Sequence, residues 1–327
     1  MRGLVLAAGL GTRLFPLTEF RAKPAVPFLN RPIIRYALDL LTEAGAKEIA
    51  VNLHHQADTV RAAVADSPGV SFSFEPEILG TGGAIANLRD FLDGDDFIVC
   101  NGKIYFEERL STMVAFHREA RSLVTLALAP MAGNEEFNPV YLDSDLRVTG
   151  FGPSHAPGLG EQPFVFTGVH VISPAVLDLI PEGPSDSVRD LYSRLIAERQ
   201  PIHGYISESY WCEISTPPRY LAKSLDVLSR RGQANLGTRL LGNCSRVIAG
   251  AGSLVDESAR LDSCILWEDV TVGANTRLKN VIVADNITLP AGLRLENSIV
   301  TARAASPEKI AASGGRCVGD RVIWPLA

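Results

Sequence analysis

The feature that most constrains the fold is an apolar run near the N-terminus that opens directly into a glycine-rich turn. Residues 3–8 form a continuous apolar segment, and Gly9 and Gly11 follow it. Such a run is typical of a strand that is buried on both faces of a parallel sheet. It is too short to span a membrane, and no small-residue cleavage site follows it. We therefore interpret it as a first strand and not as a signal peptide.

Strands and helices are predicted to alternate after this turn. Pro32 stands where a first helical turn tolerates proline, the apolar residues of 33–41 recur at helical spacing, and Gly45 marks the end of that helix. A short strand over 49–53 and a helix over 57–65 follow. This alternation is the signature of a parallel sheet with right-handed crossovers. The sequence therefore predicts a Rossmann-like α/β domain with a mixed, mostly parallel sheet.

The rest of the first domain carries further strands and two helices. We expect the strand over 97–100 to end at a turn formed by Asn101, Gly102 and Lys103. Ligands of open α/β sheets gather at the carboxyl ends of strands, so this turn is a candidate wall of a site. A last helix over 219–229 closes the domain, and the predicted domain boundaries are 1–232 and 233–327. The other expected strands cover 123–129, 139–142 and 164–172, and a helix is expected near 185–196.

The pattern changes in the second predicted domain, 233–327. From about 245 to 300, small aliphatic residues recur every five to six positions, with Asp, Asn, Gly and Ser between them. Hexapeptide coils of a β-helix need this arrangement of small apolar residues inside and polar corners outside. We predict a short left-handed β-helix that serves as a packing and homo-oligomerisation surface. A small β-sandwich is the alternative.

Composition excludes several classes of partner. The net charge of −6 argues against a general nucleic-acid surface, which needs clustered positive charge. No apolar run reaches the roughly 18 residues of a membrane span, so no membrane partner is expected. The five cysteines are odd in number and scattered, which predicts a reduced, cytoplasmic protein.

The glycine turn is suited to a polyphosphate. Gly9 and Gly11 allow backbone N–H groups to approach phosphate oxygens, and Arg13 and Lys23 add two permanent cations. The turn has no G-K-[ST] ending, so it is not a P-loop. Leu14 occupies the third glycine position of the dinucleotide-binding fingerprint, so that fingerprint is also incomplete.

The longer string around this turn closely resembles the signature of the sugar-1-phosphate nucleotidyltransferases. It reads LAAGLGTRLFPLT over 6–18 and AKPAVP over 22–27. Residues 75–84, 166–171 and 211–217 are similar to the family's base-recognition loop, its sugar-facing strand and its W-x-D-I-G-T-P motif. The resemblance implies an enzyme that joins an NTP and a sugar 1-phosphate, giving an NDP-sugar and pyrophosphate.

The resemblance also implies roles for individual residues. Catalysis by positioning and charge stabilisation would depend on Arg13, Lys23 and Lys103. Sugar contacts would come from Thr167 and Gly168. The expected nucleotide-binding residues are Leu6, Ala7, Ala8, Gly9, Gly11, Thr12, Arg13, Lys23, Gly80, Thr81, Gly82 and Asn101.

The metal site is where the sequence departs from the family. Two aspartates normally bind Mg²⁺, one in the turn after the fourth strand and one in the W-x-D motif. Lys103 and Glu213 stand at these positions. A charged lysine has no lone pair for a metal, so the usual two-Asp site is not expected and Glu213 is the one remaining candidate ligand. No organic cofactor is expected.

Several interpretations of Lys103 stay open. It replaces the charge of the metal, or it pairs with Glu213 in a site without metal. Alternatively, the chain is a catalytically inactive regulatory homologue that binds nucleotide sugars, or Lys103 was introduced into the sequence or points into solvent. An acyltransferase acting through the β-helix is disfavoured because the last histidine is His203.

Overall fold

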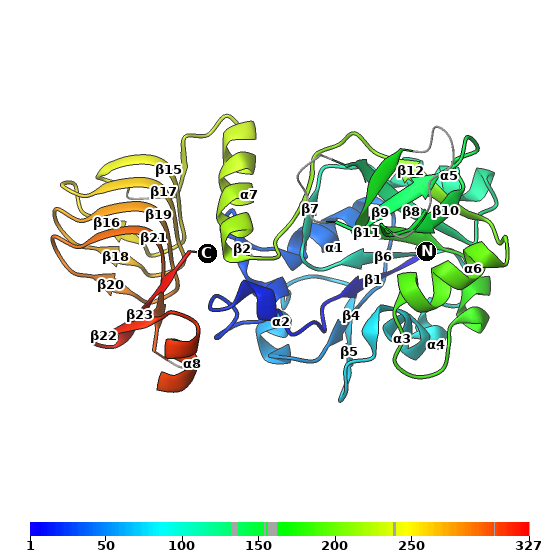
Figure 1. Cartoon of the computed structure of the whole chain (residues 1–327), viewed down its shortest axis with the longest axis horizontal. Helices are drawn as coiled ribbons and strands as arrows, with labels where there is room; N and C mark the ends of the chain where they lie inside the picture. Colours follow the sequence, from blue (N-terminus) through cyan, green and yellow to red (C-terminus); the bar gives the residue numbers. More distant parts are fainter. Residues whose placement is uncertain (132–136, 154, 156–161, 238–239, 304, 327) are drawn as a thin grey trace. The chain divides into compact units, whose positions relative to one another are not determined.

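The computed structural model describes residues 1–131, 137–153, 155, 162–237, 240–303 and 305–326. The chain divides into two compact units (Figure 1). Unit 1 comprises Met1–Leu10 and Ile33–Cys212, and unit 2 comprises Gly11–Pro32 and Glu213–Ala327. The segment after the first strand therefore groups with the C-terminal part of the chain. The predicted domain boundary at 232 lies just after helix α7 (Pro217–Arg230), which itself belongs to unit 2.

Unit 1 is built on a nine-stranded mixed sheet. Its path runs β10-β9-β11-β6-β1-β4-β5, and β8 and β12 extend it beside β11. The β6-β1-β4-β5 part is parallel, as predicted, whereas β11 runs antiparallel to β6, β8 and β9. The strands are β1 (Arg2–Leu6), β4 (Ile49–Leu53), β5 (Val70–Phe74), β6 (Phe97–Asn101), β8 (Val124–Pro130), β9 (Pro139–Leu142), β10 (Val148–Phe151), β11 (Pro163–Ile172) and β12 (Ile202–Ile206).

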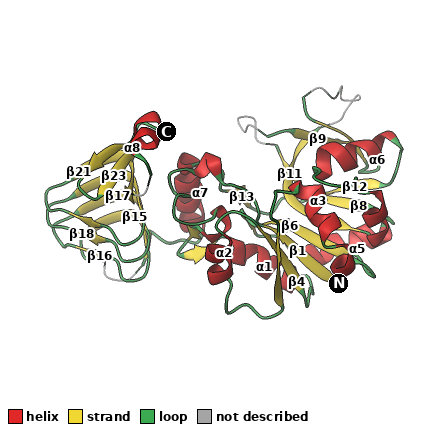
Figure 2. Cartoon of the chain, turned by 90° about the horizontal axis from the view of Figure 1, so that it is seen from below, coloured by secondary structure: helices red, strands yellow, loops and turns green. Residues whose placement is uncertain are grey.

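Helices enclose this sheet, as Figure 2 shows in red around yellow strands. Leu4 and Val5 are neighbours on β1, and both side chains are fully buried. Since successive strand residues face opposite sides, β1 is covered on both faces, which explains its continuous apolar run. The helical elements are α1 (Ile34–Glu43), α2 (Ala57–Ala63), α3 (Gly80–Asn87), α4 (Arg89–Leu92), α5 (Leu110–Glu119), η3 (Pro174–Leu179), η4 (Ser187–Tyr192) and α6 (Ser193–Ala197). Two short strands, β7 (Ile104–Phe106) and β13 (Trp211–Glu213), lie outside the large sheet.

The C-terminal part of unit 2 stacks parallel strands in successive coils, coloured yellow to orange in Figure 1. Arg260 pairs with Arg277, and Arg277 with Arg294, so each coil adds 17 residues. This stacking is consistent with the predicted β-helix, and its left-handedness stays a prediction. One sheet contains β14 (Asn235–Leu236), β15 (Asn243–Ala249), β17 (Arg260–Leu266), β19 (Arg277–Val283) and β21 (Arg294–Ala302), and another contains β16 (Leu254–Val255), β18 (Thr271–Val272) and β20 (Thr288–Leu289).

The polar residues of the repeat explain how each coil turns a corner. Arg246, Ser263, Asn280 and Asn297 occupy the same place in four successive coils, and all four have φ between 47° and 58°. Asn is one of the few side chains that tolerate this left-handed conformation. The strands can therefore bend here while their aliphatic side chains stay inside.

Other elements complete unit 2. After the coils come α8 (Pro307–Ala312), β22 (Arg316–Val318) and β23 (Arg321–Pro325), and β23 runs antiparallel to β21. The segment 11–32 contains η1 (Thr12–Leu14), η2 (Lys23–Ala25), β2 (Pro27–Phe28) and β3 (Arg31–Pro32). Pro32 thus lies in β3 and not in the first turn of α1, which begins at Ile34.

Two further observations bear on the environment of the chain. Within the described ranges, no helix combines the length and apolar character that a bilayer crossing needs. The structure describes all five cysteines, and none of them forms a disulfide.

Candidate functional site

The predicted residues of unit 1 meet at the carboxyl ends of two neighbouring parallel strands. Leu6 of β1 is paired with Asn101 of β6, and the Gly102 N–H donates a 3.0 Å hydrogen bond to the Leu6 carbonyl. Lys103 is half-buried in the same turn. This edge is where open α/β sheets bind ligands, so the structure brings together three of the residues expected there.

The neighbouring strand β11 brings Gly168 against Asn101. Gly168 has a φ of 85°, and a Cβ added there would lie 2.2 Å from Nδ2 of Asn101. Only glycine allows this approach. Thr167 is buried, and its hydroxyl donates to the carbonyl of Ala127 at 2.9 Å. The backbone carbonyl of Thr167 accepts a 2.9 Å hydrogen bond from Nε1 of Trp211. The side chain of Thr167 therefore holds the strand in place, and Gly168 leaves room at the edge.

A buried polar network supports the end of β1, and the sequence analysis did not identify it. The Ala7 N–H donates to Oδ1 of Asn52 at 2.6 Å, and Nδ2 of Asn52 donates to Oε1 of Glu75 at 2.7 Å. The second oxygen of Glu75 accepts the Leu79 N–H at 3.1 Å. Asn52 and Glu75 are 3% and 1% exposed. The network thus links the end of β1 through β4 to the turn before α3.

The second half of the predicted base-recognition segment, from Gly80, forms the first turn of α3. The N–H groups of Gly82 and Gly83 both donate to the carbonyl of Ser185, at 2.8 and 3.3 Å. The hydroxyl of Thr81 donates to Oγ of Ser187 at 3.0 Å and accepts the Ser187 N–H at 2.8 Å. The amides of Gly82 and Gly83 are therefore used inside unit 1. Gly80 is the exposed residue of this turn.

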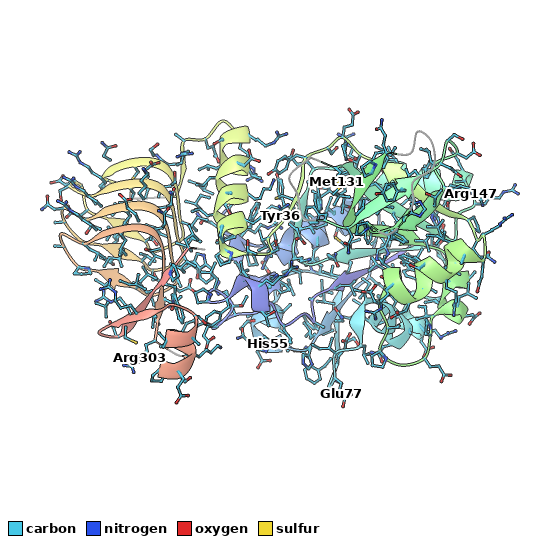
Figure 3. All side chains as sticks on the ribbon, in the orientation of Figure 1. Tyr36, His55, Glu77, Met131, Arg147 and Arg303 are labelled. Atoms are coloured by element: carbon cyan, nitrogen blue, oxygen red, sulfur yellow. The ribbon has the colours of Figure 1, made fainter. Side chains whose placement is uncertain are left out.

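The residues next to this segment differ sharply in burial. Glu77, labelled in Figure 3, projects from the surface of unit 1, whereas Glu75 belongs to the buried network. Nδ1 of His54 lies 2.8 Å from the carbonyl of Glu75, so His54 packs against the network rather than standing free in a loop. Cys100 is fully buried, and burial raises the pKa of its thiol well above the ordinary value. That environment suits a small apolar residue and not a nucleophile.

The remaining predicted residues lie in unit 2, where the glycine turn continues. Gly11 has a φ of 67°, and a Cβ there would meet Cγ2 of Thr18 at 3.1 Å and Cβ of Lys23 at 3.3 Å. The Gly11 carbonyl accepts the Leu14 N–H at 2.9 Å and the Thr18 hydroxyl at 3.1 Å. A glycine is therefore required at the start of η1, from which Thr12 and Arg13 are exposed.

The two cations of this turn have different environments. Arg13 is exposed, and its side chain makes no hydrogen bond or ion pair with the part of the chain that the structure describes. Lys23 is only 8% exposed, and its Nζ lies 3.5 Å from the carbonyl of Ser215. Glu213, two residues before Ser215, is also buried, and its carbonyl accepts a 3.1 Å bond from Nε of Arg219. Arg13 is thus available to an anionic ligand, and Lys23 is held in place.

Side chains from the C-terminal coils fix this turn, and the sequence analysis missed them. Arg21 pairs with Asp285, and its guanidinium lies 4.8 Å from the centre of the Trp267 ring. Nε1 of Trp267 donates to the Tyr220 hydroxyl at 3.0 Å, which in turn donates to the Pro27 carbonyl at 2.5 Å.

A second set of contacts comes from the segment after the coils. The ring of Phe15 meets that of Trp324 edge-on at 5.0 Å, and Nζ of Lys309 lies 4.6 Å from the centre of the Phe15 ring. The same Nζ forms a 2.8 Å ion pair with Glu19. Trp267, a bulky residue in a repeat of small aliphatic residues, was the signal that could have predicted contacts with the coils.

The chemistry of the donor set decides whether Mg²⁺ fits the expected positions. Lys103 supplies an ammonium group and Glu213 supplies one carboxylate. Among the residues that the structure describes, no group of three or more His, Cys, Asp or Glu side chains is arranged to hold a metal. One carboxylate and one ammonium group do not supply the two carboxylates of the family's two-Asp site.

The comparisons with known proteins agree with the fold and the glycine turn. The Nucleotidyl transferase family profile matches residues 2–230. A mannose-1-phosphate guanylyltransferase of Mycobacterium tuberculosis is 30% identical over 295 residues, which cover 83% of this chain and 81% of that protein. A UTP–glucose-1-phosphate uridylyltransferase of Synechocystis is 28% identical over 248 residues, covering 70% and 64%. The structure of HddC from Yersinia pseudotuberculosis is similar in fold, with a TM-score of 0.59, 23% identity and coverage of 69% of this chain and 100% of that chain.

The chain therefore belongs to the nucleotidyl transferase family. The family and the α/β fold predicted from the glycine turn are confirmed.

Proposed function

We propose that this chain joins an NTP and a sugar 1-phosphate to give an NDP-sugar and pyrophosphate. A phosphate oxygen of the sugar 1-phosphate attacks the α-phosphorus of the NTP, and the bond to the β-phosphate oxygen breaks as pyrophosphate leaves. The observation that carries the proposal is the family match over 2–230 with the glycine turn and both of its cations intact. The first substrates to test are GTP with mannose 1-phosphate, because the Mycobacterium relative carries that name. UTP with glucose 1-phosphate is the competing pair.

The proposed roles follow from the contacts of each residue. Arg13 would place its guanidinium on the phosphates and stabilise the charge that develops as the α-phosphorus is attacked. Lys23 would supply a second charge from a fixed position. Asn101 and Gly168 would form the wall along which the sugar 1-phosphate lies. We further propose that the protein acts in a reducing compartment such as the cytoplasm, since none of its five described cysteines forms a disulfide.

We propose that Lys103 supplies the fixed positive charge that a metal supplies in other members of the family. An ammonium group binds phosphate as a point charge, so this role needs no metal ligand. The half-buried position of Lys103 at the carboxyl end of β6 supports the proposal.

The test is a turnover assay with a panel of NTPs and sugar 1-phosphates, each with Mg²⁺ and with EDTA. We expect NDP-sugar formation that persists in EDTA and falls in Lys103→Ala. The matched variant Lys103→Asp restores the family's carboxylate, so its turnover should require Mg²⁺. Loss of all wild-type activity in EDTA, with Lys103→Ala unaffected, would contradict the role of Lys103. Nucleotide-sugar binding without turnover for every pair would instead favour the inactive regulatory homologue.

A further inference from the structure

A groove on the coils of unit 2 is lined by a row of arginines. The groove has a volume of about 620 Å³ and is lined by residues of β15, β17, β19 and β21. Arg260, Arg277 and Arg294 occupy the same position on three successive strands and are hydrogen-bonded neighbours in register. Adjacent strands lie about 4.8 Å apart, so the row extends over about 10 Å.

The three guanidinium groups are not neutralised by the protein. All three side chains are exposed, and none makes a hydrogen bond or ion pair with another residue of the described ranges. Like charges placed opposite each other on neighbouring strands destabilise a sheet. A row of three therefore has an energetic cost, and a bound anion would reduce it.

A second row borders the groove and defines where an anion fits. On each of the three strands, a second charged residue follows the arginine by two positions. These residues are Asp262, Lys279 and Glu296, again in register. Asp262 is paired with Arg246 at 3.3 Å. Only the middle strand, β19, carries cations in both rows, namely Arg277 and Lys279. The most positive point of the groove is therefore its centre, with a carboxylate toward each end.

This charge pattern selects a small anion over a long one. Five cationic side chains and two carboxylates line the groove, although the whole chain has a net charge of −6. An extended polyphosphate that runs along the rows would meet Asp262 and Glu296. A compact ligand centred on β19 would contact Arg277 and Lys279 and reach the outer arginines on either side.

We propose that this groove binds a small molecule that carries two phosphate groups. Guanidinium groups bind phosphate oxygens in pairs, and the centre of the groove offers two cations from β19 with an arginine on either side. The site is distinct from the glycine turn and does not depend on the proposed transferase reaction.

The proposal is tested on the full chain with inorganic pyrophosphate as the probe, using calorimetric titration and thermal unfolding. We expect saturable binding and a rise in Tm for the wild type. In Arg277→Gln, the affinity of the groove for pyrophosphate should weaken at least tenfold, and the rise in Tm should fall to what binding at the glycine turn alone produces. Arg316→Gln is the matched control, because it removes one positive charge from the exposed strand β22 outside the groove, and its binding should stay within twofold of wild type.

Three results would overturn the proposal. One is an absence of saturable binding by the wild type. The second is binding that survives Arg277→Gln and is lost in Arg13→Ala, which would assign the pyrophosphate to the glycine turn. The third is a change of oligomeric state in Arg277→Gln, measured by sedimentation, which would make the groove an interface between copies of the chain. A lack of turnover in the assay above would leave this test unaffected.

Discussion

The two segments that contain the predicted nucleotide-binding residues are stabilised in different ways. In unit 1, the end of β1 and the turn before α3 are joined by buried hydrogen bonds through Asn52 and Glu75. In unit 2, the glycine turn is held by aromatic and cationic side chains from the C-terminal coils, among them Trp267 and Lys309. The first kind of support depends on groups that have no access to water, whereas the second combines the buried Trp267 with exposed groups such as Lys309.

This difference predicts different consequences of mutation. An unpaired polar group inside unit 1 has lost both its protein partner and water, so the cost appears in stability. Exposed ion pairs and cation–π contacts contribute less to stability. Changes in the glycine turn of unit 2 should therefore affect ligand binding and turnover while the protein stays folded.

The largest effect is expected from Arg13→Ala. We expect kcat/KM to fall by roughly 100- to 1,000-fold, since loss of one group that stabilises transition-state charge has an effect of this size. The Tm should be unchanged, because the exposed side chain makes no hydrogen bond or ion pair with a described residue. Arg303→Ala, an exposed arginine of the same unit, is the control and should retain full activity. Unchanged turnover in Arg13→Ala would contradict the proposed function.

The second effect is on stability and concerns Asn52→Ala. The change leaves the Ala7 N–H and Oε1 of Glu75 buried without their partner. At 1–3 kcal/mol for each unsatisfied group, we expect the free energy of unfolding to fall by about 3 kcal/mol, measured in urea. Asn87→Ala removes an exposed hydrogen bond to Ser73 and should cost less than about 0.5 kcal/mol. Equal losses in the two variants would mean that the network is not specially stabilising.

The parts of the fold that could be predicted are those whose apolar residues follow a regular pattern along the sequence. The strand over 49–53 was predicted with the bounds of β4, because a strand buried on both faces is mostly apolar. Helix α5 was not predicted. Its buried face includes His117, whose Nδ1 lies 2.9 Å from the Thr125 hydroxyl on β8. This polar residue interrupts the apolar pattern of the helix. The five-to-six-residue spacing indicated coils, while the 17-residue register appears only when strands are paired.

The candidate site could also be predicted only in part. Adjacent strand ends were predictable, because parallel strands of one sheet end at one edge, and Leu6 and Asn101 do meet there. Asn52 was visible as the one polar residue in an apolar strand, but its partner Glu75 follows a different strand. Contacts such as Phe15 with Trp324 join positions about 300 residues apart, and no local pattern predicts them.

The third effect is on the pH dependence of stability. It concerns unit 1, because all six histidines lie there. Burial lowers the pKa of His170 from 6.5 to about 3. The unfolded chain therefore binds a proton below pH 6.5 that the folded chain does not bind until about pH 3, so stability is full above pH 6.5 and falls as the pH is lowered. Between pH 7.5 and 5.0, His170 should therefore lower the free energy of unfolding by about 2 kcal/mol.

The measurement is urea unfolding of wild type and His170→Asn at both pH values. The variant loses the 2.6 Å contact between Nδ1 and the Tyr192 hydroxyl, so it should be less stable at pH 7.5. The free energy of unfolding that the variant loses between pH 7.5 and 5.0 should be about 2 kcal/mol smaller than the loss in wild type. The same pH dependence in both proteins would show that His170 is not responsible.

The smallest effect tests whether the C-terminal contacts position the glycine turn. Lys309→Gln removes the ion pair with Glu19 and the cation above the Phe15 ring. Both contacts are largely exposed, so the loss of stability should be under about 1 kcal/mol. A less ordered turn pays more entropy when it binds a nucleotide, so we expect the KM for the NTP to rise about two- to fivefold with kcat within twofold. Arg303→Gln removes a charge from the same region without touching the turn and should leave KM unchanged. A fall in kcat at constant KM would contradict a positioning role, because it would place Lys309 in the chemical step.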